Sequence, residues 1–209
     1  MERVSADVLW ARHGENVANL TRTLSYRIFD GDLTDVGRRQ ARELGERLAA
    51  GSGDPIALLA CSPLRRARQT ADIVGQRLGL PVAMELDDLR EVNVGELDGR
   101  SDARAWEIYA EVLAAWHAGD TQARFPGGEN RDELCARLRR ALTAVARVAV
   151  AGRSLIVAHG ANLRAALPCL AGEPDPGADL STGAVAVLRI HPGGSPVARL
   201  VSWARAAPG

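Results

Sequence analysis

Lysine is absent from this chain of 209 residues, in which all 26 basic residues are arginine. Its absence excludes Schiff-base chemistry on a lysine amine and the lysine of a P-loop that binds phosphates. Aromatic residues are also scarce, at 4% of the chain. The core must therefore be built mostly from Ala, Leu and Val.

An excess of charge is missing too, because 26 acidic residues balance the 26 arginines. Proteins that bind nucleic acid or an anionic membrane surface show a basic excess, so neither is an expected partner. No apolar run approaches the roughly 18 residues of a membrane span, and residues 1–11 lack a signal-peptide pattern. We expect a soluble, cytoplasmic protein.

Cysteine occurs only at Cys61, Cys135 and Cys169, which lie far apart and form no Cys-x-x-Cys pair. This spacing suggests neither a disulfide framework nor a zinc ribbon. Reduced thiols in a cytoplasmic setting are therefore the expectation.

Short apolar segments alternate with stretches of helical periodicity. We expect strands at residues 7–11, 56–60 and 154–158, and a hairpin of 184–190 and 197–203 around Pro192-Gly193-Gly194. We expect helices from the N-cap Thr34 to about residue 48, from Ser62-Pro63 with Pro63 as the first helical residue, at 101–118, at 130–148 and up to about residue 170.

This alternation predicts an α/β fold with three layers, α/β/α, in which helices cover both faces of a mostly parallel sheet. The length of the chain is that of one domain, residues 1–209, with a small helical excursion at about 100–126. Residues 172–182 are expected to form a loop, because Gly, Pro and Asp are frequent there.

Polar residues of one chemical kind follow each of the three best strands. These segments are Arg12-His13-Gly14-Glu15-Asn16, Cys61-Ser62-Pro63-Leu64-Arg65-Arg66 and His159-Gly160-Ala161-Asn162-Leu163-Arg164. Ligands of open parallel sheets bind at the carboxyl ends of the strands. If the strands are neighbours, two histidines and at least two arginines meet at one point, which the N-terminus of the helix after Ser62-Pro63 also faces.

Such a cluster predicts a pocket for an oxyanion, because arginine presents planar, permanently charged donors that suit phosphate or carboxylate. A single histidine after a strand is more often a structural residue, but three matching strand ends make coincidence a weaker explanation. A metal site is disfavoured, because no His-x-x-x-His or carboxylate cluster accompanies the histidines and arginine repels cations.

Arg12-His13-Gly14-Glu15 resembles the signature of the histidine phosphatase (phosphoglycerate mutase-like) superfamily. Further segments resemble the motifs of that family in the expected order: Leu33–Ala41, Ser62–Ala71, Leu89–Gly99, Pro126–Glu129 and Ala158–Gly160. The resemblance spans roughly residues 7–165 and implies a phosphoglycerate mutase-like fold.

The resemblance also implies a role for each matching residue. His13 matches the nucleophile that accepts the phosphoryl group, and Glu91 matches the proton donor. Four residues match groups of the phosphate pocket: Arg12, Asn19, Arg66 and His159. We choose Arg66 over Arg65 because the arginine of the family directly precedes Ala.

Two residues depart from the family pattern. Asn16 stands where Ser or Thr is usual, and Asp98 stands where Glu is common before Gly, so both are candidates for tuning the substrate pocket. Glu15 is read as a residue behind the site or a structural one, and Cys61 as a buried thiol at a strand end.

We therefore expect a metal-independent phosphomonoesterase that needs no cofactor and hydrolyses a small phosphorylated metabolite through a phosphohistidine. Arg12, Arg66 and a protonated His159 would take the place of a metal. One alternative is a phosphoglycerate mutase. The resemblance disfavours it, because the 34 residues between Glu91 and Pro126 are fewer than in the corresponding region of the cofactor-dependent mutases. The other is a catalytically weak relative that binds a phosphorylated ligand.

Residues 20–32 and 100–126 are expected to cover the site, and the sequence leaves the substrate open. It also leaves open whether Asn16, Tyr26, Trp106 and Trp116 contact the substrate. Packing of the excursion on the sheet is the competing explanation for Trp106. Residues 20–29 are equally a candidate subunit contact, which would make a homodimer.

Overall fold

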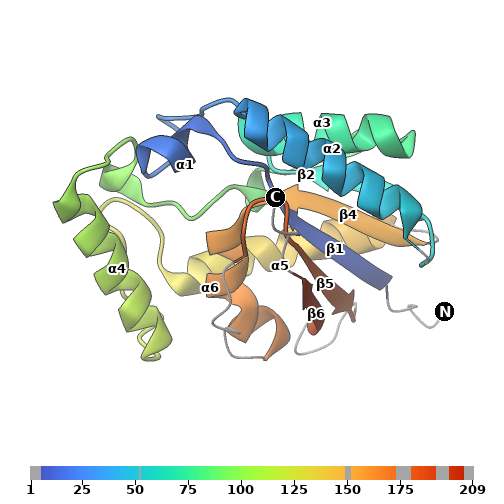
Figure 1. Cartoon of the computed structure of the whole chain (residues 1–209). Coiled ribbons are helices and arrows are strands. Elements are labelled where there is room, and N and C mark those ends of the chain that lie inside the picture. Colours follow the sequence, from blue (N-terminus) through green and yellow to red (C-terminus); the bar gives the residue numbers. More distant parts are fainter. Residues whose placement is uncertain (1–5, 52, 149–151, 173–179, 192–197, 205–209) are drawn as a thin grey trace.

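One six-stranded sheet, in the order β3-β2-β4-β1-β5-β6, organises the chain (Figure 1). The computed structural model describes residues 6–51, 53–148, 152–172, 180–191 and 198–204. The strands are β1 (Ala6–Arg12), β2 (Ile56–Cys61), β3 (Met84–Glu85), β4 (Arg153–Ala158), β5 (Val185–Ile190) and β6 (Ala198–Ala204). Strands β3, β2, β4 and β1 are parallel, whereas β5 and β6 add an antiparallel edge.

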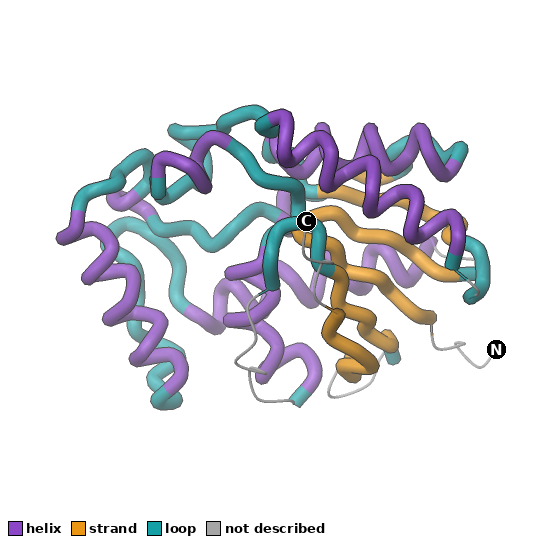
Figure 2. The backbone as a smooth tube through the Cα atoms, in the orientation of Figure 1, coloured by secondary structure: helices purple, strands orange, loops and turns teal. Residues whose placement is uncertain are grey.

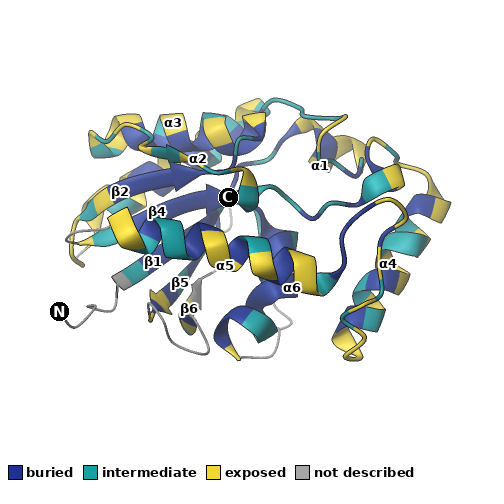
Figure 3. Ribbon diagram, turned by 180° about the vertical axis from the view of Figure 1, so that it is seen from behind, coloured by how far each residue is buried: buried dark blue, intermediate teal, exposed yellow. Residues whose placement is uncertain are grey.

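Helices cover both faces of the sheet (Figure 3). They are α1 (Val17–Thr21), α2 (Asp35–Ala50), α3 (Arg65–Leu78), α4 (Ala103–His117), α5 (Arg131–Val148) and α6 (Gly160–Ala171). On one face, Leu44 of α2 and Val74 of α3 pack with Leu155 of β4. On the other face, Leu138 of α5 and Leu163 of α6 pack with neighbouring strand residues. The predicted three-layer α/β/α fold is confirmed.

Local sequence explains where the main elements begin and why they are buried. The Thr34 hydroxyl accepts the N–H of Gly37, as expected of the N-cap of α2. All residues of β4 after Arg153 are buried, which is typical of a parallel strand covered on both faces. The helix after β2 begins later than predicted, because Leu64 is its N-cap and Pro63 precedes it.

Several short or irregular elements carry too little sequence signal to be predicted. Helix α1 has five residues and β3 has two. Segments this short do not repeat a hydrophobic pattern often enough for it to be recognised. The predicted hairpin forms between β5 and β6. Its turn and most of the predicted loop at 172–182 lie outside the described residues.

The helix predicted at 101–118 is α4, which lies beyond the carboxyl ends of the parallel strands in Figure 1. Long connections, drawn as teal tube in Figure 2, lead to it and from it. Trp116 and Phe125 are almost fully buried and meet edge to face, 5.5 Å between ring centroids. Their burial attaches α4 to the rest of the molecule.

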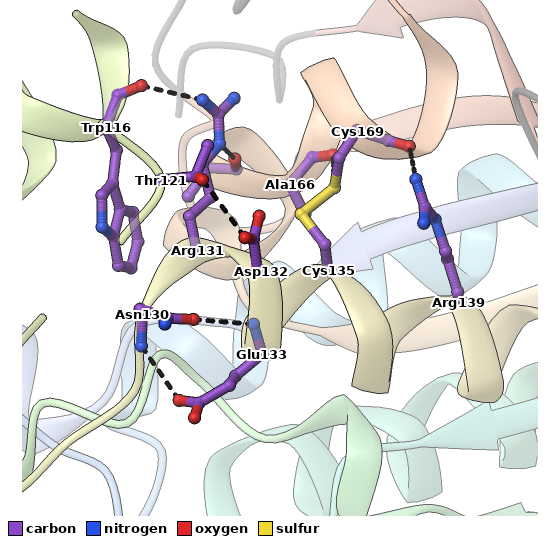
Figure 4. The surroundings of a disulfide bond; sticks show 11 residues. Trp116, Thr121, Asn130, Arg131, Asp132, Glu133, Cys135, Arg139, Ala166 and Cys169 are labelled. Carbon is purple, nitrogen blue, oxygen red and sulfur yellow. Dashed lines mark hydrogen bonds between the residues drawn. A yellow bond between two sulfur atoms is a disulfide. The ribbon is translucent and has the colours of Figure 1, made fainter. Parts of the chain in front are cut away.

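The expectation that the cysteines stay reduced is wrong for two of the three. Cys135 of α5 and Cys169 of α6 form a disulfide, with 6.3 Å between their Cα atoms (Figure 4). The pairing depends on which faces of α5 and α6 meet, and a separation of 34 residues does not reveal that. Among the described residues, no helix combines the length and the hydropathy that crossing a bilayer requires.

Candidate active site

The three strands followed by polar segments are direct neighbours, in the order β2-β4-β1. Their parallel direction brings the three segments to one edge of the sheet. A cavity of about 200 Å³ opens there, lined by predicted site residues that include Arg12, His13, Asn19, Arg66 and Glu91. The convergence predicted from the strand ends is therefore present.

The loop after β1 is held by its backbone. The N–H groups of residues 13–16 all have acceptors, which are Ala158 O, Thr70 Oγ1, Gln40 Oε1 and Asn19 Oδ1. At Gly14, a Cβ atom would lie 2.4 Å from the carbonyl oxygen of Gly37, so this position requires glycine. An anion in the cavity must be bound by groups other than these four N–H donors.

His13 is buried, and its ring is fixed by two hydrogen bonds. Nδ1 lies 2.7 Å from the carbonyl oxygen of Gly14, and Nε2 lies 3.1 Å from Nε of Arg66. Because arginine only donates, Nε2 must be the acceptor and the ring proton must reside on Nδ1. Burial, followed by the charges of Arg66 and Arg12, holds the pKa of His13 well below its usual value. His13 is therefore neutral, with its Nε2 lone pair exposed to the cation.

Arg66 is buried beside His13, and a neighbouring segment holds its guanidinium. Nη1 donates to Ser25 Oγ at 2.9 Å and Nη2 to the Ser25 carbonyl at 3.0 Å. Arg65, by contrast, is exposed and pairs with Asp32. Its backbone N–H, at the N-terminus of α3, donates to Asp30. Arg66 therefore lines the cavity and Arg65 does not, while the phosphate-binding role chosen for Arg66 stays a prediction.

Asp98, the residue that departs from the family pattern, holds the segment that carries Ser25. Its carboxylate accepts the backbone N–H groups of Tyr26, Arg27 and Ile28 at 2.6–2.8 Å. Asp98 does not itself line the cavity. Its contacts therefore shape the wall that holds Arg66.

Arg12 lies at the end of β1 and lines the cavity. Its Nη1 donates to the carbonyl oxygen of Leu180 at 2.6 Å. A Cβ atom at Gly160 would approach the Arg12 Cδ atom to 3.0 Å, so the small residue after His159 leaves space for the arginine.

His159 is fully buried, and its ring lies edge-on to His13 with 5.2 Å between centroids. Its Nε2 lies 2.9 Å from Ser62 Oγ, and its Nδ1 has no hydrogen-bond partner. Burial and the charge of Arg66 hold the pKa of His159 well below its usual value. The lowered pKa favours a neutral His159 in the free protein, which differs from the protonated form that the sequence led us to expect around a bound phosphate.

Glu91 is held at the cavity by its side chain and by its backbone. Its Oε1 accepts the N–H groups of Val92 and Asn162, at 2.9 and 2.8 Å. Arg137 of α5 donates to the Glu91 carbonyl at 2.9 Å and forms a buried, bidentate pair with Glu129. No local sequence signal selects Arg137, because its contacts join segments far apart in the chain.

The aromatic residues of α4 divide between the cavity and the core. Trp106 and Tyr109 line the cavity, and their rings meet edge to face. Burial raises the pKa of Tyr109, so its hydroxyl remains a neutral hydrogen-bonding group. Trp116 is buried away from the cavity, and its indole N–H donates to Ala123 O. Tyr26 packs against the core and does not line the cavity.

Two other residues considered from the sequence, Glu15 and Cys61, do not line the cavity. Glu15 accepts the hydroxyl of Thr34, which places it behind the loop. Cys61 is a buried free thiol whose pKa burial raises to about 12. Within the described part of the chain, no group of three or more His, Cys, Asp or Glu side chains could hold a metal ion.

Comparison with known proteins adds an independent line of evidence. The profile of the histidine phosphatase superfamily (branch 1) matches residues 8–203. A metal-independent phosphoserine phosphatase of Arabidopsis thaliana is 32% identical over 79% of this chain and 68% of its own. A 2,3-bisphosphoglycerate-dependent phosphoglycerate mutase of Methylobacterium is 36% identical over 91% of this chain and 92% of its own.

A solved structure with a similar fold is also that of a phosphatase. The mycobacterial glucosyl-3-phosphoglycerate phosphatase, in its complex with VO3, is 27% identical and superposes with a TM-score of 0.78. The match covers 96% of this chain and 99% of that one. The fold is therefore phosphoglycerate mutase-like.

Proposed function

The chain belongs to the histidine phosphatase superfamily, and we propose that it hydrolyses a small phosphomonoester through a phosphohistidine at His13. The observation that carries this proposal is the Nε2 atom of His13. It is unprotonated, it lies in a cavity beside Arg66, and Nδ1–H···O=C of Gly14 fixes the direction of its lone pair. A neutral imidazole held in this way is a nucleophile at neutral pH.

In the first step, Nε2 of His13 attacks phosphorus in line with the ester bond. The N–P bond forms, the P–O bond breaks, and the leaving oxygen takes its proton from the carboxyl group of Glu91. Because Glu91 Oε1 already accepts two N–H groups, Oε2 is the oxygen that we assign to proton transfer.

In the second step, the ionised Glu91 takes a proton from water as that water attacks phosphorus. The N–P bond breaks, its electron pair returns to Nε2 of His13, and inorganic phosphate leaves. The sum of both steps is ester plus water giving alcohol plus phosphate. One carboxyl group thus serves as acid and then as base.

The charge of the transferred phosphoryl group would be met by side chains. Arg12 and Arg66 supply permanent positive charge. His159 supplies a neutral donor, since its unpartnered Nδ1 carries the proton when the Ser62 hydroxyl donates to Nε2. Asn19 lines the same cavity, and its Oδ1 accepts the Asn16 N–H, so its NH2 group remains for a phosphate oxygen.

The cavity suits a small phosphorylated metabolite. Its volume of about 200 Å³ leaves room beyond the phosphate for only a few non-hydrogen atoms. Trp106 and Tyr109 form the wall that the leaving group would face. The names of two relatives specify phosphoserine and glucosyl-3-phosphoglycerate as their substrates.

A mutase remains a second candidate, because several relatives carry the name of a phosphoglycerate mutase. The Methylobacterium mutase aligns over almost its whole length, so a short segment between Glu91 and Pro126 does not separate the two activities. A mutase would transfer the phosphoryl group of His13 to a second hydroxyl group instead of water.

The test is to trap the covalent intermediate. Enzyme mixed with a 32P-labelled alkyl phosphate and quenched within one turnover should carry label that is stable in base and labile in acid. A His13→Asn variant should carry none. In a parallel sample that is not quenched, 3-phosphoglycerate is added to the labelled enzyme to separate the two candidates. A phosphatase then releases inorganic phosphate, whereas a mutase forms bisphosphoglycerate. Wild-type protein that binds the phosphate ester without labelling or turnover would identify the weak binder and overturn the proposal.

A further inference from the structure

Asn16 and Asn19 form two reciprocal hydrogen bonds at the start of α1. The Asn16 Oδ1 accepts the N–H of Asn19 at 3.2 Å, and the Asn19 Oδ1 accepts the N–H of Asn16 at 3.0 Å. Each amide oxygen is therefore occupied by a backbone donor, which fixes which end of each amide is oxygen. Both side chains keep their NH2 groups for other partners.

The NH2 group of Asn16 has no partner. Asn16 is fully buried, its Nδ2 atom lacks a hydrogen-bond acceptor, and the residue lines the cavity beside His13. A buried donor without an acceptor destabilises the folded state. Such a group is retained most readily where a ligand satisfies it.

A phosphoryl group in this cavity needs side-chain donors. The backbone N–H groups of residues 13–16 already have protein acceptors, and three N–H groups of Arg66 donate to His13 and Ser25. The three non-bridging oxygens of a phosphoryl group together accept six or more hydrogen bonds, so each further donor matters.

We infer that Asn16 binds the transferred phosphoryl group by donating from Nδ2 to a non-bridging oxygen. This inference rests on the proposed phosphatase function. A Ser or Thr at this position would also accept the Asn19 N–H through its hydroxyl, and would offer one O–H donor where the asparagine offers two N–H donors. The asparagine therefore adds one donor to the phosphate site.

Two variants separate the donor from the helix cap. Asn16→Asp keeps an oxygen for the Asn19 N–H and replaces the NH2 by a carboxylate oxygen that repels phosphate. Asn16→Gly removes the donor altogether, and glycine is the residue without a side chain that an N-cap position tolerates best. Asn130 provides the matched control, because it is a buried residue before α5 whose Oδ1 accepts the Glu133 N–H away from the cavity.

The measurement is the affinity for vanadate and for inorganic phosphate, by calorimetry, together with the thermal midpoint. We expect Asn16→Gly to bind both anions about 10- to 100-fold more weakly, the effect of losing a hydrogen bond to a charged group. Asn16→Asp should bind them more weakly still, and Asn130→Gly as the wild type does. The thermal midpoint of Asn16→Asp should stay close to that of the wild type, because Asn and Asp cap helices about equally well, and that of Asn16→Gly should fall only slightly.

The outcomes are distinguishable. Wild-type affinity for vanadate in Asn16→Asp would overturn the role of Asn16, because a carboxylate in contact with the oxyanion must lower its affinity. If Asn16→Asp does not fold, wild-type affinity in Asn16→Gly overturns it equally. A wild-type protein that binds neither anion would overturn the phosphatase proposal itself.

Discussion

Arg66 and His13 are in contact before any substrate arrives, because the Nε–H of the arginine donates to Nε2 of the histidine at 3.1 Å. The lone pair that would attack phosphorus is the one that this hydrogen bond uses. Substrate must therefore draw the guanidinium from the histidine to a phosphate oxygen. The same contact prevents His13 from taking a proton from solvent.

Replacing Arg66 by Lys tests this relationship. Lysine keeps the charge but cannot contact His13 and both acceptors of Ser25 at once. We expect Arg66→Lys to lower kcat/KM by about 10²–10³, the effect of losing a preorganised donor in an enzyme site. Arg65→Lys is the matched control and should change kcat/KM little, because Arg65 is exposed. Equal losses in the two variants would mean that the adjacent arginines are wrongly distinguished.

The stability of the protein should fall on the acid side of neutrality. The pKa values of His13 and His159 are lowered in the folded state, so below about pH 6.5 the unfolded chain binds more protons than the folded one. Each histidine should lower the free energy of unfolding by up to about 1.4 kcal/mol per pH unit below that point. Urea denaturation between pH 7.5 and 5.5 measures the slope, and His159→Gln should reduce it. A wild-type slope of zero across this range contradicts the neutral histidines.

The role of Glu91 predicts a dependence on the leaving group. A general acid contributes about 10²–10⁴-fold where the leaving oxygen needs a proton. Glu91→Gln should therefore slow hydrolysis of an alkyl phosphate far more than that of p-nitrophenyl phosphate, whose leaving group departs without protonation.

The second step gives Glu91→Gln a further signature. If the carboxylate also activates water, phosphorylated His13 accumulates and p-nitrophenol appears in a rapid burst before slow turnover. Equal steady-state losses on both substrates without a burst would show that Glu91 is structural.

Turnover should survive excess EDTA and be inhibited by vanadate. Arg12 and Arg66 carry the positive charge that a metal would supply, and vanadate mimics the phosphoryl group in transfer. Phosphate release is measured after dialysis against EDTA and again after addition of Mg²⁺, Mn²⁺ or Zn²⁺. Activity that disappears with the chelator and returns with one of these ions would contradict the mechanism.

Reduction of the disulfide between Cys135 and Cys169 should destabilise the protein without changing its catalysis. A disulfide that closes a loop of this size typically contributes about 2–4 kcal/mol to the free energy of unfolding. Neither cysteine lines the cavity, so kcat/KM should stay the same. Urea unfolding of the wild type with and without reductant measures the loss. Cys135→Ser without reductant should be as stable as the reduced wild type. If reductant leaves the unfolding of the wild type unchanged, the disulfide does not stabilise the protein.

The convergence of the strand-end residues on one cavity could be predicted from the sequence, because local signals determine it. The strand ends place His13 and His159, and Thr34 marks a helix start by its own chemistry. The neutral state of His159 was not predictable, because it depends on the burial of Arg66 beside it. Asp98 and Arg137 act through backbone groups distant in sequence, a kind of contact that leaves no periodic pattern.

The residues that line the cavity come from two kinds of segment. Arg12, His13 and Arg66 closely follow strands of the sheet, whereas Trp106 and Tyr109 belong to α4, which lies beyond the carboxyl ends of the parallel strands (Figure 1). Substitutions at Trp106 or Tyr109 would change the lining of the cavity without moving a strand. In the proposed phosphatase, a different ester could therefore be accommodated by changes in α4 while Arg12, His13 and Arg66 stay in place.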